Sequence, residues 1–260
     1  IPPRHIITNG RGDGKAVNTM NIRDFKALRF DVSKRPYDFS RSLGKEGLGK
    51  NVKSFLKHLN VECSRVYFMN QTHSDHCVVL DDIHDEEDFL GFRIVPDTDA
   101  LITSKRGVAL ISRISDCTPV LLYDPIKGVQ ACIHSGWRPT VKKLPQIAVE
   151  TMKRRYGSSP KNIYAYIGPC IGRESFQVGK EVSEAWRDAF PFHREVIRYS
   201  DKDHDYIDLK LTHIRMLQQM GVPDDHITVN IADTFTDPRY HSYRRDKPDF
   251  GSNALVSILK

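Results

Sequence analysis

The chain has 260 residues, with 39% hydrophobic and 28% charged residues and a formal net charge of +6. This composition is ordinary for a globular protein, and no apolar run approaches the ~20 residues that a membrane-spanning helix needs. The basic residues are scattered and no nucleic-acid-binding motif accompanies them, so we expect an anionic small ligand, with neither nucleic acid nor a membrane as partner. The length suits one large domain over residues 1–260, and the sequence does not indicate the oligomeric state.

Cysteine usage predicts the compartment. The number of cysteines is odd, they are widely spaced, and none forms a CxxC pair, which argues against a disulfide scaffold or a zinc ribbon. The start of the chain lacks the basic-then-apolar order of a secretory signal. We therefore expect a reducing, cytoplasmic location. The five cysteines are Cys63, Cys77, Cys117, Cys132 and Cys170.

The first half of the chain mixes loops, one helix and short strands. The first ~50 residues are polar and rich in glycine, which predicts loops around short strands. Apolar residues at helical spacing predict a helix over residues 51–60. Apolar runs predict strands over residues 65–71, 77–83 and 100–104. The acidic run over residues 81–88 is typical of a solvated loop rather than a metal site.

The second half carries longer apolar runs. They predict strands over residues 108–115, 119–124, 128–135, 162–169, 226–230 and 252–260, and helices over residues 141–157, 180–190 and 209–221. Most strands are apolar on both faces, which favours sheets that are covered on both sides. Because strands and helices do not alternate strictly, we expect a single α+β domain with mixed β-sheets flanked by helices.

Two apolar runs stop at residues capable of chemistry. Cys117 follows the first run in SDCTP, and His134 ends a later run in HSGWRP. Their spacing suits a strand, a turn and a returning strand, and Gly136 lets the backbone approach a ligand closely. A buried structural cysteine and a buried core histidine would be the simpler interpretation. Reactive groups at strand ends, however, are a usual arrangement for a functional site.

His73 is a third candidate, because it also follows a predicted strand. Two histidines and one cysteine can hold zinc with a position left open, and the same donors suit copper(I). Alternatively, Cys117 could be a nucleophile with His134 as its base, in a metal-free hydrolase or amidase assisted by Asp116 or His73.

Several segments in this order resemble one family. They are QTHS, DTDALIT, SDCTPVLLYDP, HSGWR, IGPCIG and SYRRD, and they resemble the YfiH-like family, also called the laccase-domain or multicopper polyphenol oxidase family. The resemblance runs from about Gln71 to the C-terminus. It implies the YfiH-like, cysteine-hydrolase-type fold. Four positions depart from the family pattern: Ser115, Pro139, Thr234 and Ser252 stand where Ala, Gly, Cys and Arg are usual.

The resemblance also implies an activity and its residues. Family members are described as purine nucleoside phosphorylases acting on adenosine, inosine, guanosine and methylthioadenosine, with adenosine deamination in several. His73, Cys117 and His134 match the family's zinc ligands, and copper is an alternative occupant. The expected partners are therefore a purine nucleoside and inorganic phosphate.

Roles for five further residues complete the expected site. Asp116 is expected to be catalytic, with Asp116 or Asp99 moving a proton. Arg138 and Arg244 are candidates for holding phosphate, because guanidinium groups bind anions through paired contacts. Gln71 and Asp99 are expected to contact substrate. A catalytically weakened member that acts by binding is the remaining alternative.

Overall fold

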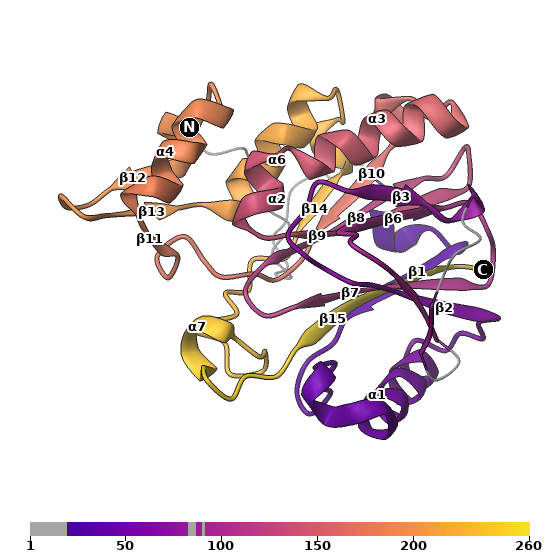
Figure 1. The fold of residues 1–260 in the computed structure, drawn as a ribbon. Coiled ribbons are helices and arrows are strands. Elements are labelled where there is room, and N and C mark those ends of the chain that lie inside the picture. The colour runs from indigo at the N-terminus through magenta and orange to yellow at the C-terminus, as the bar shows by residue number, and fades with distance from the viewer. Residues whose placement is uncertain (1–19, 83–86, 90–91) are drawn as a thin grey trace, which may run out of the picture.

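Two six-stranded sheets pack face to face in the computed structural model, which describes residues 20–82, 87–89 and 92–260 (Figure 1). In spatial order, the first sheet contains β1 (Leu28–Val32), β15 (Asn253–Leu259), β7 (Val108–Ile114), β2 (Arg65–Met69), β5 (Phe92–Val95) and β4 (Glu87–Phe89). The second contains β14 (Ile227–Val229), β10 (Tyr164–Ile167), β8 (Thr118–Asp124), β9 (Val129–Ser135), β6 (Ala100–Thr103) and β3 (Cys77–Val79).

Both sheets are mixed. In the first sheet β7 pairs with β2 in parallel and with β15 in the antiparallel sense. In the second sheet β10 pairs with β14 in parallel and with β8 in the antiparallel sense. The predicted α+β class with mixed sheets is therefore confirmed.

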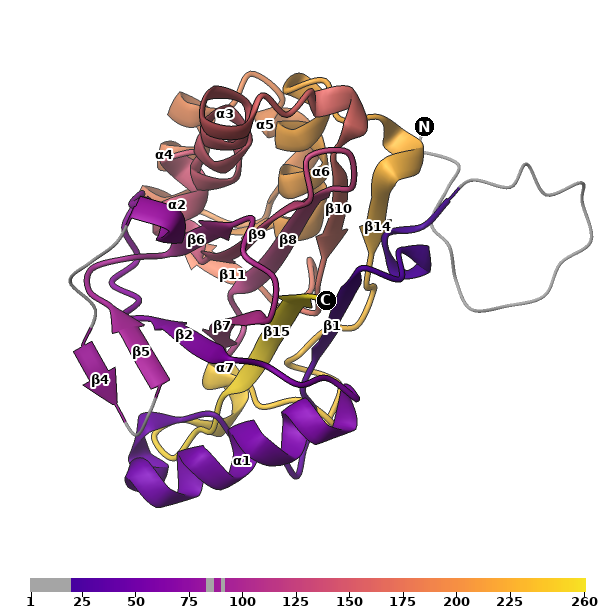
Figure 2. The same cartoon turned by 90° about the vertical axis from the view of Figure 1, so that its right-hand side faces the viewer.

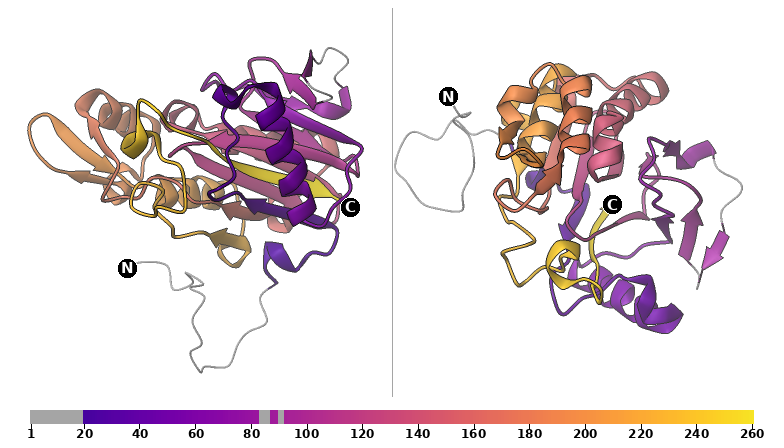
Figure 3. Two further views of the ribbon diagram at one scale, coloured as in Figure 1. Left: turned by 90° about the horizontal axis from the view of Figure 1, so that it is seen from below. Right: turned by 60° about the vertical axis from the view of Figure 1, so that its left-hand side comes forward.

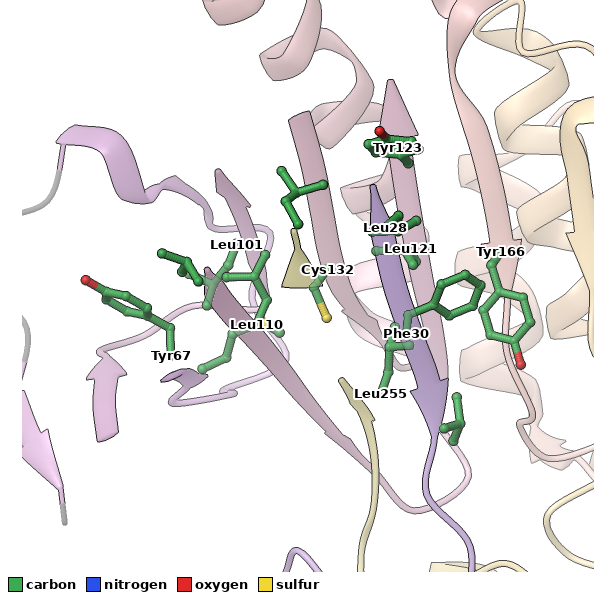
Figure 4. Packing of buried hydrophobic residues seen from close by; sticks show 14 of the residues in the cluster. Leu28, Phe30, Tyr67, Leu101, Leu110, Leu121, Tyr123, Cys132, Tyr166 and Leu255 are labelled. Atoms are coloured by element: carbon green, nitrogen blue, oxygen red, sulfur yellow. The ribbon is translucent and has the colours of Figure 1, made fainter. Parts of the chain in front are cut away.

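The main core lies between the two sheets. Leu110 and Leu255 of the first sheet pack with Leu101, Leu121 and Cys132 of the second, as Figure 4 shows. Strands β8, β9 and β15 are buried along their whole length, as their apolar residues on both faces predict.

Helices cover the outer faces of the sheets. Helix α1 (Gly44–His58) packs on the first sheet, and α3 (Leu144–Tyr156) and α6 (Leu209–Gln219) pack on the second (Figure 2). The order of layers is thus helix, sheet, sheet, helix. The other helices are α2 (Trp137–Val141), α4 (Lys180–Ala189), α5 (His193–Val196) and α7 (Tyr243–Asp246).

A third, smaller sheet extends from this body. It contains β11 (Gln177–Gly179), β13 (His204–Ile207) and β12 (Ile197–Tyr199) in that order, and its β12–β13 hairpin projects outward (Figure 3). These three short strands carry too few apolar residues to be predicted from the sequence. Helix α4 lies against them, with Trp186 and Val182 in a separate core cluster.

A second difference from prediction concerns the start of α1. We expected a helix from residue 51, with a loop before it, but the helix begins at Gly44. The helix is confirmed over residues 51–58, but its predicted start was wrong because glycine is ordinarily a loop signal. Leu48 is buried against the first sheet, and this tertiary contact supports the helical turn that Gly47 and Gly49 disfavour.

Some of the remaining predictions can be compared with the structure, and others fall on residues outside the described ranges. Helix α3 begins at Leu144, later than the predicted residue 141, has Pro145 in its first turn and is capped after Tyr156 by Gly157, which has a positive φ of 66°. Residues 83–86 of the predicted acidic loop lie outside the described residues. So do residues 1–19, and one domain over residues 1–260 stays a prediction. None of the helices in the described ranges has both the length and the apolar character needed to cross a membrane.

Candidate metal centre

Three predicted site residues meet at the ends of strands from both large sheets. His73 lies in the loop after β2, and Cys117 lies where the chain passes from β7 in the first sheet to β8 in the second. His134 is near the end of β9, which pairs with β8 so that Pro119 faces His134. The predicted strand, turn and returning strand are confirmed.

The donor atoms of the three residues lie within 4.8 Å of one another. Cys117 Sγ is 3.8 Å from His73 Nε2, and the two imidazole rings meet edge to face, with centroids 4.9 Å apart. A set of two imidazole nitrogens and one sulfur fits zinc or copper(I). The structure therefore brings together the three residues that the sequence suggested as one cluster.

The backbone around the cluster has unusual conformations. His73 has a φ of 60° and Asp116 a φ of 85°, values that residues other than glycine adopt infrequently. Such conformations cost about 1–3 kcal/mol each and persist where surrounding contacts hold them. The loops that carry His73 and Cys117 are therefore held in one shape by their neighbours.

Asp99 supplies much of this support from behind the cluster. The side chain is fully buried, and its Oδ1 accepts a hydrogen bond from His134 Nδ1 at 2.7 Å. Its Oδ2 accepts hydrogen bonds from the Ser74 amide and hydroxyl, both at 2.7 Å, and from the Thr72 amide at 3.2 Å. One carboxylate thus fixes His134 and the loop that carries His73.

Because Nδ1 is bound to Asp99, Nε2 is the nitrogen of His134 that can bind a metal. A carboxylate that accepts from the other ring nitrogen is the usual support of a metal-binding histidine. Burial raises the pKa of Asp99, but hydrogen bonds from His134 and Ser74 outweigh it and lower the pKa to about 2. With both oxygens occupied, the geometry favours a positioning role for Asp99 over the expected substrate contact or proton transfer.

The sulfur and the imidazole of the cluster influence each other's protonation. Burial raises the pKa of Cys117, but the charge of His134 and hydrogen bonds from both histidines lower it to about 6. Burial lowers the pKa of His134, but Cys117 and Asp99 raise it to about 9. Cys117 is therefore a thiolate at neutral pH, which is the form that binds metal.

Asp116 has a different set of partners. Its Oδ1 accepts from the Thr234 hydroxyl at 2.6 Å, and its Oδ2 accepts from the Ser242 hydroxyl at 3.0 Å and the Arg244 amide at 2.7 Å. The carboxylate joins the Cys117 loop to the segment before β15. This favours structural support over the expected proton transfer, and the sequence did not indicate Thr234 or Ser242 as partners of Asp116.

Three expected substrate contacts make protein contacts in the structure. The Gln71 side chain pairs with the backbone of Arg113, donating at 2.7 Å and accepting at 3.0 Å. Arg244 donates to the Gln177 carbonyl. Arg138 is exposed and lies 4.3 Å from the Trp137 ring centroid. Their roles toward a substrate stay predictions, with Arg138 the most accessible.

The four departures from the family pattern are accommodated locally. Pro139 is the third residue of α2, where a helix leaves the backbone N–H without a partner in any case. Thr234 holds Asp116, as described above. Ser115 donates to the Gly251 carbonyl at 2.7 Å, and its hydroxyl lies 3.3 Å from that of Ser252.

Comparison with known proteins assigns the class. Residues 32–260 match the model of the family described as multi-copper polyphenol oxidoreductase laccase, so the chain belongs to this family. YlmD from Geobacillus stearothermophilus shares the fold, with a TM-score of 0.82 over 91% of this chain and 93% of that chain, at 22% identity.

Relatives with named activities match more limited regions. A purine nucleoside phosphorylase from Bacteroides thetaiotaomicron is 38% identical over 130 residues, which are 50% of this chain and 48% of the relative. The purine nucleoside phosphorylase YlmD from Bacillus subtilis is 32% identical over 156 residues, 59% of this chain and 56% of the relative. The match thus spans about half the length of these two relatives. The adenosine deaminase RL5, from an unknown prokaryotic organism, is 34% identical over 176 residues, 65% of each chain.

Proposed function

We propose that this protein is a zinc-dependent purine nucleoside phosphorylase, with adenosine deamination as a second activity. The observation that carries the proposal is the convergence of His73, Cys117 and His134, with the Asp99 carboxylate fixed behind His134. The names of the relatives support the reaction class. Adenosine, inosine, guanosine and methylthioadenosine are the proposed substrates.

The residues of the cluster have two roles, metal binding and the positioning of a metal ligand. His73 Nε2, Cys117 Sγ and His134 Nε2 would hold the ion, which supplies Lewis acidity to a polar group of the bound ligands. Asp99 keeps His134 in the tautomer that carries its proton on Nδ1. In phosphorolysis, a phosphate oxygen forms a bond to ribose C1′ as the bond from C1′ to the purine nitrogen breaks. The chain must therefore orient a phosphate and a nucleoside together.

The test combines metal content with product analysis. Purified protein should contain about one zinc per chain, as expected for a three-ligand site. It should cleave adenosine or inosine only with inorganic phosphate, yielding ribose 1-phosphate. Cys117→Ala and His134→Ala should lose zinc and activity, while Cys63→Ala, a cysteine outside the cluster, should keep both. Cleavage at the same rate without phosphate would contradict phosphorolysis, and zinc with no turnover would favour the binding-protein alternative.

A second candidate is a metal-free cysteine hydrolase or amidase. It is favoured by the low pKa of Cys117 beside the raised pKa of His134, which describes a thiolate–imidazolium pair. Iodoacetamide distinguishes the two proposals, because a metal-bound thiolate reacts slowly and a free thiolate reacts fast. Cys117 should resist labelling in zinc-loaded protein and react after chelation. Cys132 and Cys170 are buried internal controls. Rapid labelling with zinc present, together with lost activity, would support the hydrolase.

A further inference from the structure

A pocket of about 530 Å³ adjoins the segments that lead into the metal cluster. Arg113 lines it from β7, two residues before Ser115 in the connection to Cys117. Arg41 lines it from the 3-10 turn Arg41–Leu43 and donates at 2.7 Å to Asn70, which precedes the His73 loop. The pocket is therefore connected to the segments that precede both ligand-bearing loops, directly through Arg113 and through the hydrogen bond from Arg41 to Asn70.

We infer that this pocket binds a phosphoryl group through the guanidinium groups of Arg41 and Arg113. Within the part of the chain that the structure describes, neither guanidinium forms an ion pair with a carboxylate. Arg41 donates to the neutral Asn70 amide, and Arg113 reaches the Met69 carbonyl at a long 3.5 Å. Two unneutralised guanidinium groups in one pocket are favourable when an anion lies between them.

Arg113 is the stronger indication of the two. Its Nε is enclosed without a hydrogen-bond partner in the described structure. Burial, followed by the charge of Arg41, lowers the pKa of Arg113 to about 10. The two positive charges thus repel each other, and a bound anion would relieve this repulsion.

The other polar residues that line the pocket are compatible with a bound oxyanion. The Ser42 hydroxyl lies 2.8 Å from Ser40 Oγ and can donate to an anion, whereas the Ser40 hydroxyl already donates to Asp38. Two carboxylates also line the pocket, Asp38 and Asp249. Asp38 accepts from the Ser40 amide, the Ser40 hydroxyl and the Ser252 amide, so it holds the wall together rather than neutralising an arginine. Asp249 is exposed.

The proposed function bears on this inference in one respect only: it decides which molecule carries the phosphoryl group that the pocket binds. Inorganic phosphate is the source if the pocket holds the co-substrate of phosphorolysis. A nucleoside monophosphate is the source if the pocket holds the phosphate of a nucleotide. The test therefore titrates zinc-loaded protein by calorimetry, in low salt, with inorganic phosphate, with adenosine monophosphate and with adenosine.

Arg41→Gln and Arg113→Gln should each weaken binding of the phosphoryl ligand by about 10- to 100-fold, the usual effect of losing a charged hydrogen bond. Binding of adenosine should be unchanged. Lys161→Gln, which removes an exposed charge from the turn Pro160–Asn162, should bind as the native protein does. Arg113→Lys should keep part of the affinity, because the charge remains and the planar fork is lost. Arg41→Gln is the variant at the exposed position, so it is informative even if Arg113→Gln fails to fold.

The outcomes answer three separate questions: whether the pocket binds a phosphoryl group, which ligand carries that group, and whether the proposed reaction occurs. Weakened phosphate binding in both glutamine variants supports the site with free phosphate as ligand, and weakened binding of the monophosphate alone supports it with a nucleotide. Native affinity in both variants, or loss only in Arg138→Gln, would overturn the inference. Phosphate binding through Arg41 and Arg113 without nucleoside cleavage contradicts the proposed function alone. Phosphate-dependent cleavage, with native affinity for both phosphate and the monophosphate in both variants, contradicts the inference alone.

Discussion

Gly136 decides how closely the three cluster residues can approach one another. Its backbone angles, φ −72° and ψ −176°, suit any residue, so conformational freedom is not the reason for glycine here. The reason is space. A Cβ at this position would lie 2.8 Å from Cys117 Sγ and 2.9 Å from His73 Cδ2, closer than such atoms approach in proteins.

Gly136→Ala should therefore weaken zinc binding by at least 10-fold while the protein still folds. The added methyl displaces two of the three ligands, and overpacking of this kind costs about 1–3 kcal/mol. Zinc affinity by competition with a chelator, together with the melting temperature of the metal-free protein, measures both effects. Gly49→Ala on α1 is the matched control, because a Cβ there has no neighbour within 4 Å in the structure. Unchanged zinc affinity in Gly136→Ala would show that the ligands do not converge as described.

The sequence predicted the members of the cluster better than the roles of their neighbours. Cys117 and His134 were identifiable because each lies at the end of an apolar run, and the end of such a run is visible in the local sequence. The role of Asp99 was not, since it depends on hydrogen bonds to Ser74 and His134 that form only when β6 and β9 pair. Ser74, directly after His73, was the available signal in the sequence, because its hydroxyl donates to the buried Asp99 carboxylate.

At the scale of elements, α6 buries a histidine that the proposed reaction does not use. His213 is fully buried, donates from Nδ1 to the Leu209 carbonyl at 2.6 Å, and has no partner at Nε2 among the described residues. Burial lowers its pKa to about 4. Helix α6 therefore packs on the second sheet with a neutral imidazole.

This histidine should make the fold sensitive to mild acid. Below its unfolded pKa of about 6.5, the unfolded chain binds a proton that the folded protein excludes until about pH 4. The free energy of unfolding should fall by roughly 2 to 3 kcal/mol between pH 7 and pH 4.5 from this residue alone. His213→Gln should lose that part of the pH dependence in urea titrations at the two pH values.

His204→Gln, on the exposed end of β13, is the control and should keep the native pH dependence. An equal loss of stability in His213→Gln and the native protein would contradict the assignment. The change in the free energy of unfolding with pH must be compared between variant and native protein, because carboxylates such as Asp246 also lose favourable contacts in stronger acid. Arg245 lowers the pKa of Asp246 to about 2, so its contribution is lost mainly below pH 4.

Elements were predictable where the apolar pattern is long and local. Strands β7, β8, β9 and β15 and helices α4 and α6 follow their apolar residues closely. Strands β11, β12 and β13 have three or four residues each and gain their stability from one another and from α4. No local pattern marks such segments, since their pairing joins residues that are distant in the chain.

On the scale of the whole molecule, the order of the strands could not be predicted from the sequence. Strand β15 at the end of the chain inserts between β1 and β7, and β1 lies near the start of the described chain. The candidate metal centre lies where the two large sheets are joined. His73 follows a strand of the first sheet, His134 is on the second, and Cys117 connects them. A bound ion would thus link the two halves of the fold.

Zinc should therefore stabilise the entire fold rather than a single loop. An ion that binds only the folded protein adds about 2.7 kcal/mol when free zinc is 100 times its Kd. For a chain of this size, each 1 kcal/mol raises the melting temperature by about 2–4 °C. Chelation should accordingly lower the melting temperature by roughly 5–10 °C, with one unfolding transition before and after. Cys117→Ser should melt at the temperature of the chelated native protein and show no change on adding zinc, whereas Cys63→Ser should behave as the native protein does. A melting temperature that zinc leaves unchanged, or one that rises equally in Cys117→Ser, would show that the ion does not bridge the sheets through this residue.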